Sequence, residues 1–163
     1  MLNTLQAGQT LERTSSRLVG VWKLLSYTEE KEGCQDTHPL GLTPTGFLIY
    51  TPDGFVSAQL MKPGRSAFQS LDWHQGTPEE YVESGSGYIA YCGTYEVDEA
   101  KRTVTHIPSV ALLPNLIRGR QLRAFELNGD RLTLRTASVT DAGGVLVSSH
   151  LEWQRAGRPA RSA

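Results

Sequence analysis

The sequence predicts an all-β protein, an eight-stranded antiparallel up-and-down barrel with a short N-terminal helix and one inserted helix near residues 77–85. Three observations support this prediction: eight short runs have the composition of β-strands, turn signals separate them, and their order allows one hairpin to follow another. A sheet that closes on itself has no exposed edges, so this order favours a barrel. A β-sandwich is the competing architecture.

The N-terminal segment is expected to contain the short helix. Thr10 is a suitable cap for a helix over residues 11–18, because its hydroxyl can accept a hydrogen bond from an otherwise unpaired backbone N–H. Residues 1–9 are predicted to be flexible, and so are residues 157–163 near the other end of the sequence. A single barrel domain is therefore expected over residues 10–156.

The predicted strands are separated by recognisable turns. Residues 51–54, Thr-Pro-Asp-Gly, suit a tight turn because proline presets φ and glycine supplies a positive φ. Asn128 and Gly129 form a second strong hairpin signal. The eight predicted strands cover residues 21–29, 47–50, 55–61, 88–97, 103–110, 121–127, 131–138 and 145–155.

The inserted helix has the clearest local signal. Thr77 is the cap, Pro78 occupies the first helical position and Glu80 follows three residues after the cap, which is the pattern of a capping box. The helix is expected to end near Ser84, before Gly85. A long connection that carries its own helix between two strands is a candidate lid over a binding site.

Composition limits the classes of partner. Sixteen Lys and Arg residues balance 17 Asp and Glu residues, and no basic stripe is present, so no nucleic-acid partner is expected. Apolar runs are far shorter than the roughly 18 residues that span a bilayer, and residues 1–9 lack the features of a signal peptide. Cys34 and Cys92 lack metal-ligand spacing and are expected to be free thiols of a cytoplasmic protein.

Several segments resemble a known family. Gly20 and Trp22, within residues 18–24, are similar to the Gly-x-Trp opening of lipocalin and calycin barrels. Further segments resemble the small bacterial and fungal lipocalin-like domain family, and the resemblance extends over roughly residues 18–155. These segments are residues 44–54, 87–98, 103–106 and 121–127.

The resemblance implies an eight-stranded barrel with an internal cavity, and it implies no single activity. Some relatives by fold bind hydrophobic ligands, and some barrels of similar shape in natural-product pathways act as cyclases or isomerases. Family members often carry a second histidine directly after the one that matches His106. Here that position is Ile107, which argues against a two-histidine metal site.

Strand alternation indicates which side chains face the barrel interior. Gln121 and Arg123 share a face with Phe125 and Leu127, which favour the core. An unpaired buried charge is costly, so an inward arginine requires a partner or a ligand. The other residues predicted to face inward are Trp22, Leu24, Ser26, Leu48, Tyr50, Phe55, Ser57, Gln59, Met61, Tyr91, Tyr95, Val104, His106, Leu132, Leu134, Thr136, Ser149, Leu151 and Trp153.

Three inward residues are candidate catalytic groups. His106 and Tyr50 could exchange a proton with a ligand, and Arg123 could stabilise negative charge on a ligand oxygen. Each has a structural alternative. His106 could be a core histidine whose ring is satisfied by a tyrosine or the backbone, and Tyr50 could be a core aromatic with a hydroxyl partner. Arg123 could close the barrel floor by stacking on Trp22 or Trp153, a role for which Arg155 competes.

The remaining candidates are ligand-binding residues on inward strand faces or in loops near the expected mouth. They are Gln121, Tyr91, Tyr95, Gln59, Ser57, Leu48, Phe125, Leu134, Asn115 and Trp73. For Trp73 the alternative is an ordinary surface turn, and for the two tyrosines it is a role as core aromatics. The four histidines are scattered, so no metal site is predicted, and no cofactor is required.

Three functional hypotheses remain open. In the first, the cavity encloses a small, largely apolar organic molecule such as a natural-product intermediate and promotes a cofactor-independent cyclisation or isomerisation. In the second, the protein is a non-catalytic carrier or sequestering protein for a hydrophobic metabolite. In the third, side chains fill the interior. Arg123 close to His106 favours chemistry, whereas Arg123 against Trp22 favours binding alone. A monomer and a homodimer are both compatible with the sequence.

Overall fold

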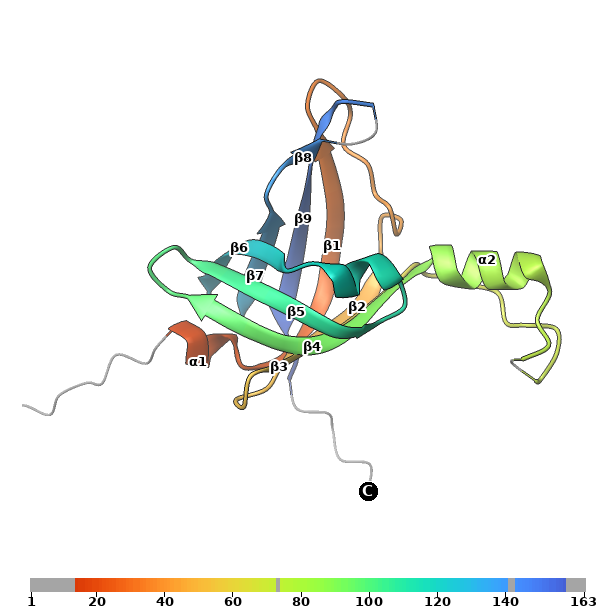
Figure 1. Cartoon of the computed structure of the whole chain (residues 1–163), viewed down its shortest axis with the longest axis horizontal. Helices are drawn as coiled ribbons and strands as arrows, with labels where there is room; N and C mark the ends of the chain where they lie inside the picture. Colours follow the sequence, from red (N-terminus) through yellow and green to blue (C-terminus); the bar gives the residue numbers. More distant parts are fainter. Residues whose placement is uncertain (1–13, 73, 141–142, 158–163) are drawn as a thin grey trace, which may run out of the picture.

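The computed structural model describes residues 14–72, 74–140 and 143–157. Its barrel strands are β1 (Gly20–Lys31), β2 (Thr45–Tyr50), β3 (Phe55–Met61), β4 (Tyr88–Asp98), β5 (Thr103–Ala111), β6 (Gln121–Asn128), β7 (Arg131–Thr136) and β9 (Leu146–Arg155). Strands β1 to β7 pair in sequence order, β9 follows β7, and β9 pairs back with β1 (Figure 1). The predicted eight-stranded antiparallel barrel is confirmed.

One strand falls outside the predicted set. The strand predicted over residues 131–138 ends at Thr136, and a two-residue strand β8 (Val139–Thr140) follows it. Strand β8 pairs with the first residues of β9, Leu146 and Val147. It therefore extends one side of β9 and takes no part in closing the barrel, which the pairing of β1 with β9 completes.

The two predicted helices are present with different relations to the barrel. Helix α1 (Thr14–Leu18) is the described part of the helix predicted over residues 11–18, and its predicted cap, Thr10, lies outside the described residues. Helix α2 (Pro78–Ser86) has the predicted capping box between Thr77 and Glu80. Helix α2 buries no residue and projects away from the barrel (Figure 1). In this arrangement it does not cover the barrel as the predicted lid would.

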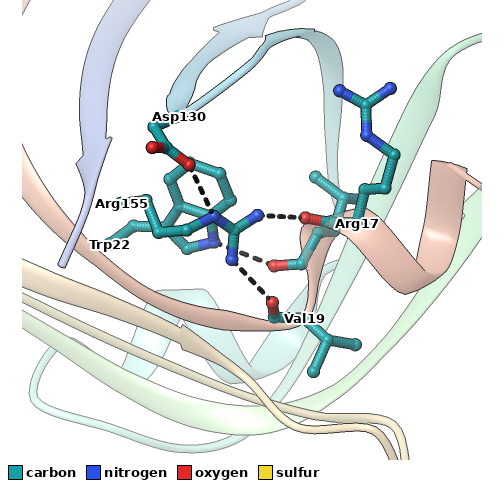
Figure 2. A network of polar contacts seen from close by, with 6 residues as sticks. Arg17, Val19, Trp22, Asp130 and Arg155 are labelled. Carbon is teal, nitrogen blue, oxygen red and sulfur yellow. Dashed lines mark hydrogen bonds and ion pairs between the residues drawn. The ribbon is translucent and has the colours of Figure 1, made fainter. Parts of the chain in front are cut away.

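The end of the barrel where the chain enters β1 is closed by Arg155 (Figure 2). Its guanidinium carbon lies 4.1 Å from the ring centroid of Trp22. The same group donates hydrogen bonds to the backbone carbonyls of Val19 and Arg17, and its Nε lies 3.3 Å from a carboxylate oxygen of Asp130. The floor position that was considered for Arg123 is thus occupied by Arg155.

The Gly-x-Trp opening has a structural reason at this floor. Gly20 has a φ of +134°, which side-chain-bearing residues rarely adopt, and a Cβ at this position would lie 2.7 Å from Nη1 of Arg155. Two residues later, Trp22 is fully buried and its indole N–H donates to the carbonyl of Leu18. Glycine leaves the space that the guanidinium needs in order to reach the tryptophan ring.

Part of the barrel interior is packed by side chains. Trp22, Phe125, Leu127 and Leu132 are buried, and none of them borders the internal cavity described below. Burial of each large apolar side chain contributes about 1.5–3 kcal/mol. This packed part supports the end that Arg155 closes and confines the cavity to the remainder of the interior.

Candidate functional site

The barrel interior contains a partly open cavity of about 210 Å³. For comparison, an apolar protein cavity of about 150 Å³ can bind benzene. The cavity has room for a ligand the size of one substituted aromatic ring. Its lining comes from all eight barrel strands and from the segment that carries the 3₁₀ turn η1 (Pro114–Arg118): Tyr27, Leu48, Ala58, Leu60, Ile89, Tyr91, His106, Leu113, Leu116, Gln121, Arg123, Leu134, Thr136, Ser149, Leu151 and Trp153.

The turn η1 covers a place where two strands separate. The ladder between β5 and β6 ends at the pair formed by His106 and Gln121. Beyond this pair the connecting segment folds back along β5, and Leu113 and Leu116 border the cavity. Leu113 borders the cavity and is also 45% exposed, so this apolar segment contacts both the cavity and solvent.

The cavity wall divides into an apolar and a polar part. Leu48, Ala58, Leu60 and Ile89 form the apolar part on β2, β3 and β4. Polar atoms come mainly from the opposite strands: Tyr27, His106, Gln121, Arg123, Thr136 and Ser149. No carboxylate lines the cavity among the described residues, and Arg123 has no ion-pair or hydrogen-bond partner within that part of the chain. The polar side therefore presents an unneutralised cation.

His106 is the most deeply buried polar residue of the site, with an exposed fraction of 0%. Its Nε2 lies 2.6 Å from the hydroxyl oxygen of Tyr50, and its Nδ1 lies 2.7 Å from the hydroxyl oxygen of Tyr91. Three strands supply this triad: β2 carries Tyr50, β4 carries Tyr91 and β5 carries His106. Tyr91 borders the cavity, whereas Tyr50 lies behind the histidine.

The electrostatics of the triad favour neutral groups. Burial in a low-dielectric interior holds the pKa of His106 well below its ordinary value of 6.5, and the positive charge of Arg123 lowers it further. Burial also raises the pKa of Tyr50 well above 10.0, with a further increase from Tyr91. The imidazole and the Tyr50 phenol are therefore uncharged at neutral pH.

Tyr27 is a second tyrosine on the cavity wall. Its hydroxyl donates to a carboxylate oxygen of Glu29 at 3.0 Å. Burial raises its pKa to about 12, although a hydrogen bond with Ser149 acts in the opposite direction. Its proton is already committed to a protein acceptor.

Several residues predicted for the site do come together at the cavity. His106, Arg123, Gln121, Tyr91, Leu48 and Leu134 all line it. Tyr50 contacts the site through His106. Arg123 lies in this cavity together with His106, and its charge lowers the pKa of the imidazole, so the two groups are electrostatically coupled.

The prediction for β3 was wrong by one residue. Val56, Ala58 and Leu60 are buried, whereas Phe55 is 51% exposed. Cross-strand pairing explains the result, because directly paired residues share a face: Ala58 is opposite Leu48 and Val56 is opposite Tyr50. The predicted ligand-binding residues Ser57 and Gln59, together with Met61, consequently lie on the outer face of the barrel.

A bulge changes the inward face of β1. The pairing of β1 with β9 shifts between Leu24 and Ser26, and Tyr27 becomes the inward residue beyond the shift. The predicted inward position of Ser26 was therefore wrong, because an extra residue reverses the alternation that follows it. Tyr27 was missed for this reason.

Three other predicted ligand-binding residues lie away from the cavity. Phe125 faces inward but belongs to the packed part of the core. Tyr95 packs edge-on against Tyr50 and donates to the carbonyl of Thr51. Asn115 is exposed on η1, where Leu113 and Leu116 border the cavity instead. Trp73 lies outside the described residues.

The structure adds apolar residues to the site that were not proposed as ligand contacts. Ala58, Leu60 and Ile89 come from strands β3 and β4, and Leu113 and Leu116 from the η1 segment. An apolar pair on the expected loop over residues 112–118 was the available signal for the latter. Thr136, Ser149, Leu151 and Trp153 were predicted to face inward, and they line the cavity.

Two other kinds of site are absent from the part of the chain that the structure describes. Within residues 14–72, 74–140 and 143–157, no three His, Cys, Asp or Glu side chains gather closely enough to hold a metal ion. In the same part of the chain, no helix combines the length and apolar character needed to cross a membrane.

Comparison with known proteins places the chain in a family. The family model described as a lipocalin-like domain matches residues 19–156. A curated protein named 4'-hydroxy-3'-methoxypropiophenone carrier protein, from Aspergillus oryzae, is 30% identical over 106 residues, which cover 61% of this chain and 96% of that protein. No solved structure matches the chain at a significant level. The chain belongs to the lipocalin-like domain family.

Proposed function

We propose that this protein binds a small, largely apolar organic molecule in its cavity and acts as a carrier for it. The observation that carries the proposal is the cavity itself, whose apolar wall faces a few polar groups. Apolar walls supply affinity, and a few hydrogen-bonding groups fix orientation. Its volume of about 210 Å³ suits one substituted aromatic ring.

The class of ligand is suggested by the relative from Aspergillus oryzae. The molecule in its name is a substituted phenyl ketone, with one aromatic ring and oxygen atoms that accept hydrogen bonds. Tyr91, Gln121 and Arg123 all line the cavity and offer hydrogen-bond donors to a ligand. We propose aryl ketones and related aromatic metabolites as the ligands.

A catalytic role is the second candidate, and the joint presence of Arg123 and His106 at one cavity favours it. In that role Arg123 stabilises negative charge on a ligand oxygen and His106 or Tyr50 transfers a proton, giving an isomerisation or cyclisation. The low pKa of His106 and the high pKa of Tyr50 argue against this role, because a proton-transfer group works best with a pKa near the working pH.

The fluorescence of Trp153 provides a direct test, since its ring lines the cavity. The protein is titrated with 4'-hydroxy-3'-methoxypropiophenone, and binding is confirmed by calorimetry. Saturable one-to-one binding with unchanged ligand after incubation supports a carrier. Recovery of an isomer or cyclised product, absent from a boiled-protein control, supports the enzyme. Absence of binding by this compound and by a panel of other aromatic ketones contradicts the proposed ligand class.

Filling the cavity is expected to weaken binding while the fold persists. Ala58 is buried on the apolar wall, so Ala58→Leu adds carbon atoms inside the cavity. The added carbon atoms crowd a ligand bound in the cavity. If this crowding costs as much as overpacking a protein core, about 1–3 kcal/mol, the affinity for the ligand falls by about five- to 150-fold. Ala90→Leu on β4 is the matched control, because its neighbour Tyr91 faces the cavity and alternation places Ala90 on the outer face. Equal affinity in both variants would place the ligand elsewhere.

We also propose a reducing, cytoplasmic location. The support is chemical: Cys34 and Cys92 are both exposed and unpaired. Fractionation of the source cells with an antibody to the protein tests this part of the proposal independently of ligand binding.

A further inference from the structure

The hydroxyl of Tyr50 has a restricted choice of hydrogen-bond partners. Tyr50 is 1% exposed, and among the described residues its hydroxyl is bonded to His106 Nε2 alone, at 2.6 Å. A phenol hydroxyl carries one proton to donate. If Nε2 carried the imidazole proton and donated it to Tyr50, the Tyr50 proton would remain buried without an acceptor, which is an unfavourable arrangement.

The alternative arrangement satisfies the Tyr50 hydroxyl proton and both ring nitrogens of His106. Tyr50 donates its proton to Nε2 of His106, so the proton of the neutral imidazole is carried by Nδ1. That Nδ1–H donates to the hydroxyl oxygen of Tyr91 at 2.7 Å. Tyr91 then has its own O–H left to donate, and its side chain lines the cavity.

We infer that Tyr50 fixes His106 as the Nδ1–H tautomer and thereby makes the Tyr91 hydroxyl a hydrogen-bond donor to the ligand. Tyr50 and His106 are positioning residues in this chain of hydrogen bonds, and Tyr91 is the contact group. The part of the inference that concerns the ligand rests on the proposed function. Tyr91 selects a ligand with an acceptor oxygen, such as a carbonyl, over the corresponding hydrocarbon.

The other groups at the cavity agree with an acceptor-bearing ligand. Arg123 supplies donors only and has no partner in the described part of the chain. The indole N–H of Trp153, whose ring also lines the cavity, is buried and has no hydrogen-bond partner there. No lining carboxylate is present among the described residues to accept from the ligand. A ligand oxygen would therefore meet a wall dominated by donors.

The tautomer is measured without any ligand. A variant H38Q/H74Q/H150Q, made without a histidine tag, leaves His106 as the single histidine of the four. None of the three replaced residues lines the cavity. At pH 7.5, long-range proton–nitrogen NMR correlations are expected to show a pyrrole-type Nδ1 and a pyridine-type Nε2. A protonated Nε2 would overturn the inference.

The contact is measured with a matched pair of probes, propiophenone and propylbenzene, which differ by the carbonyl oxygen. Tyr91→Phe is expected to weaken propiophenone binding by about three- to tenfold, the effect of one hydrogen bond, and to leave propylbenzene binding nearly unchanged. Tyr27→Phe is the control, because Tyr27 also lines the cavity but donates its proton to Glu29. It should preserve the ratio of the two affinities.

The outcomes separate the two proposals. If wild-type protein binds propiophenone and Tyr91→Phe leaves the preference for the ketone intact, the inference fails and the binding function stands. If neither probe nor any larger aromatic ketone binds, the proposed ligand class fails, and the NMR measurement alone still decides the tautomer. A single cooperative thermal unfolding transition of Tyr91→Phe is the check that the barrel is intact, and a lower midpoint is expected because Nδ1–H of His106 loses its acceptor.

Discussion

At the scale of single residues, two arginines with similar sequence expectations have opposite roles. Arg155 is neutralised by Asp130, covers Trp22 and donates to two backbone carbonyls at the closed end. Arg123 lines the cavity without such partners in the described chain. The position of each guanidinium relative to the barrel axis decides whether it stabilises the fold or faces a ligand.

Removal of the Arg155 side chain is therefore expected to affect stability. Arg155→Ala removes the stack on Trp22, the ion pair with Asp130 and two hydrogen bonds. We expect a loss of about 2–4 kcal/mol in the free energy of unfolding, measured by urea denaturation. Arg131→Ala, at an exposed position of β7, is the control and should change it by less than about 0.5 kcal/mol. A comparable loss in both variants would contradict the assigned role.

At the scale of elements, the helix with the strongest local sequence signal, α2, is not the one that borders the cavity. Helix α2 is specified by its own capping box and buries no residue, whereas η1 has no side-chain cap yet brings Leu113 and Leu116 to the cavity. Local sequence signals were strong for the element that lies away from the site and weak for the element that covers it. Apolar contact with the barrel, and not helix propensity, positions η1.

This separation leads to a prediction for α2. Thr77→Ala removes the cap and should destabilise the helix by about 1 kcal/mol. Loss of protection from hydrogen exchange is expected across residues 78–86, while ligand affinity stays within a factor of two, because α2 does not border the cavity. A large fall in affinity would restore the lid hypothesis. The corresponding change at the cavity, Leu116→Ala, should weaken binding.

At the scale of the whole molecule, the buried triad links stability to pH. His106 faces Tyr50, Tyr91 and the cation of Arg123, and its folded-state pKa lies well below the ordinary 6.5. The unfolded chain therefore takes up a proton as the pH falls below about 6.5, and the folded barrel does not. The contribution of neutral His106 is fully present above this pH and is lost progressively below it.

The free energy of unfolding should depend on pH because of the titration of His106. Between pH 6.5 and pH 5, the free energy of unfolding is expected to fall with a limiting slope of about 1.4 kcal/mol per pH unit from His106. The measurement is urea denaturation at several pH values. His106→Gln should be less stable than wild type at pH 7.5 and should lack this part of the slope. Identical slopes in both proteins would show that His106 is not the responsible group.

The amount that could be predicted from the sequence differs between strands. On β5 and β6 the apolar neighbours predict the inward face correctly, and His106, Gln121 and Arg123 line the cavity as alternation indicates. On β3 both faces carry apolar residues, so alternation alone allowed two choices. Because Leu48 pairs with Ala58, the face of β3 that carries Ala58 points inward.

The sequence by itself determined the order of antiparallel hairpins that closes into a barrel and the capping box of α2, because these depend on local periodicity and turn chemistry. Only the tertiary structure decided the inward face of β3, the bulge that turns Tyr27 inward and the Tyr50–His106–Tyr91 triad. These depend on register between strands, and a shift of one residue exchanges the two faces of a strand.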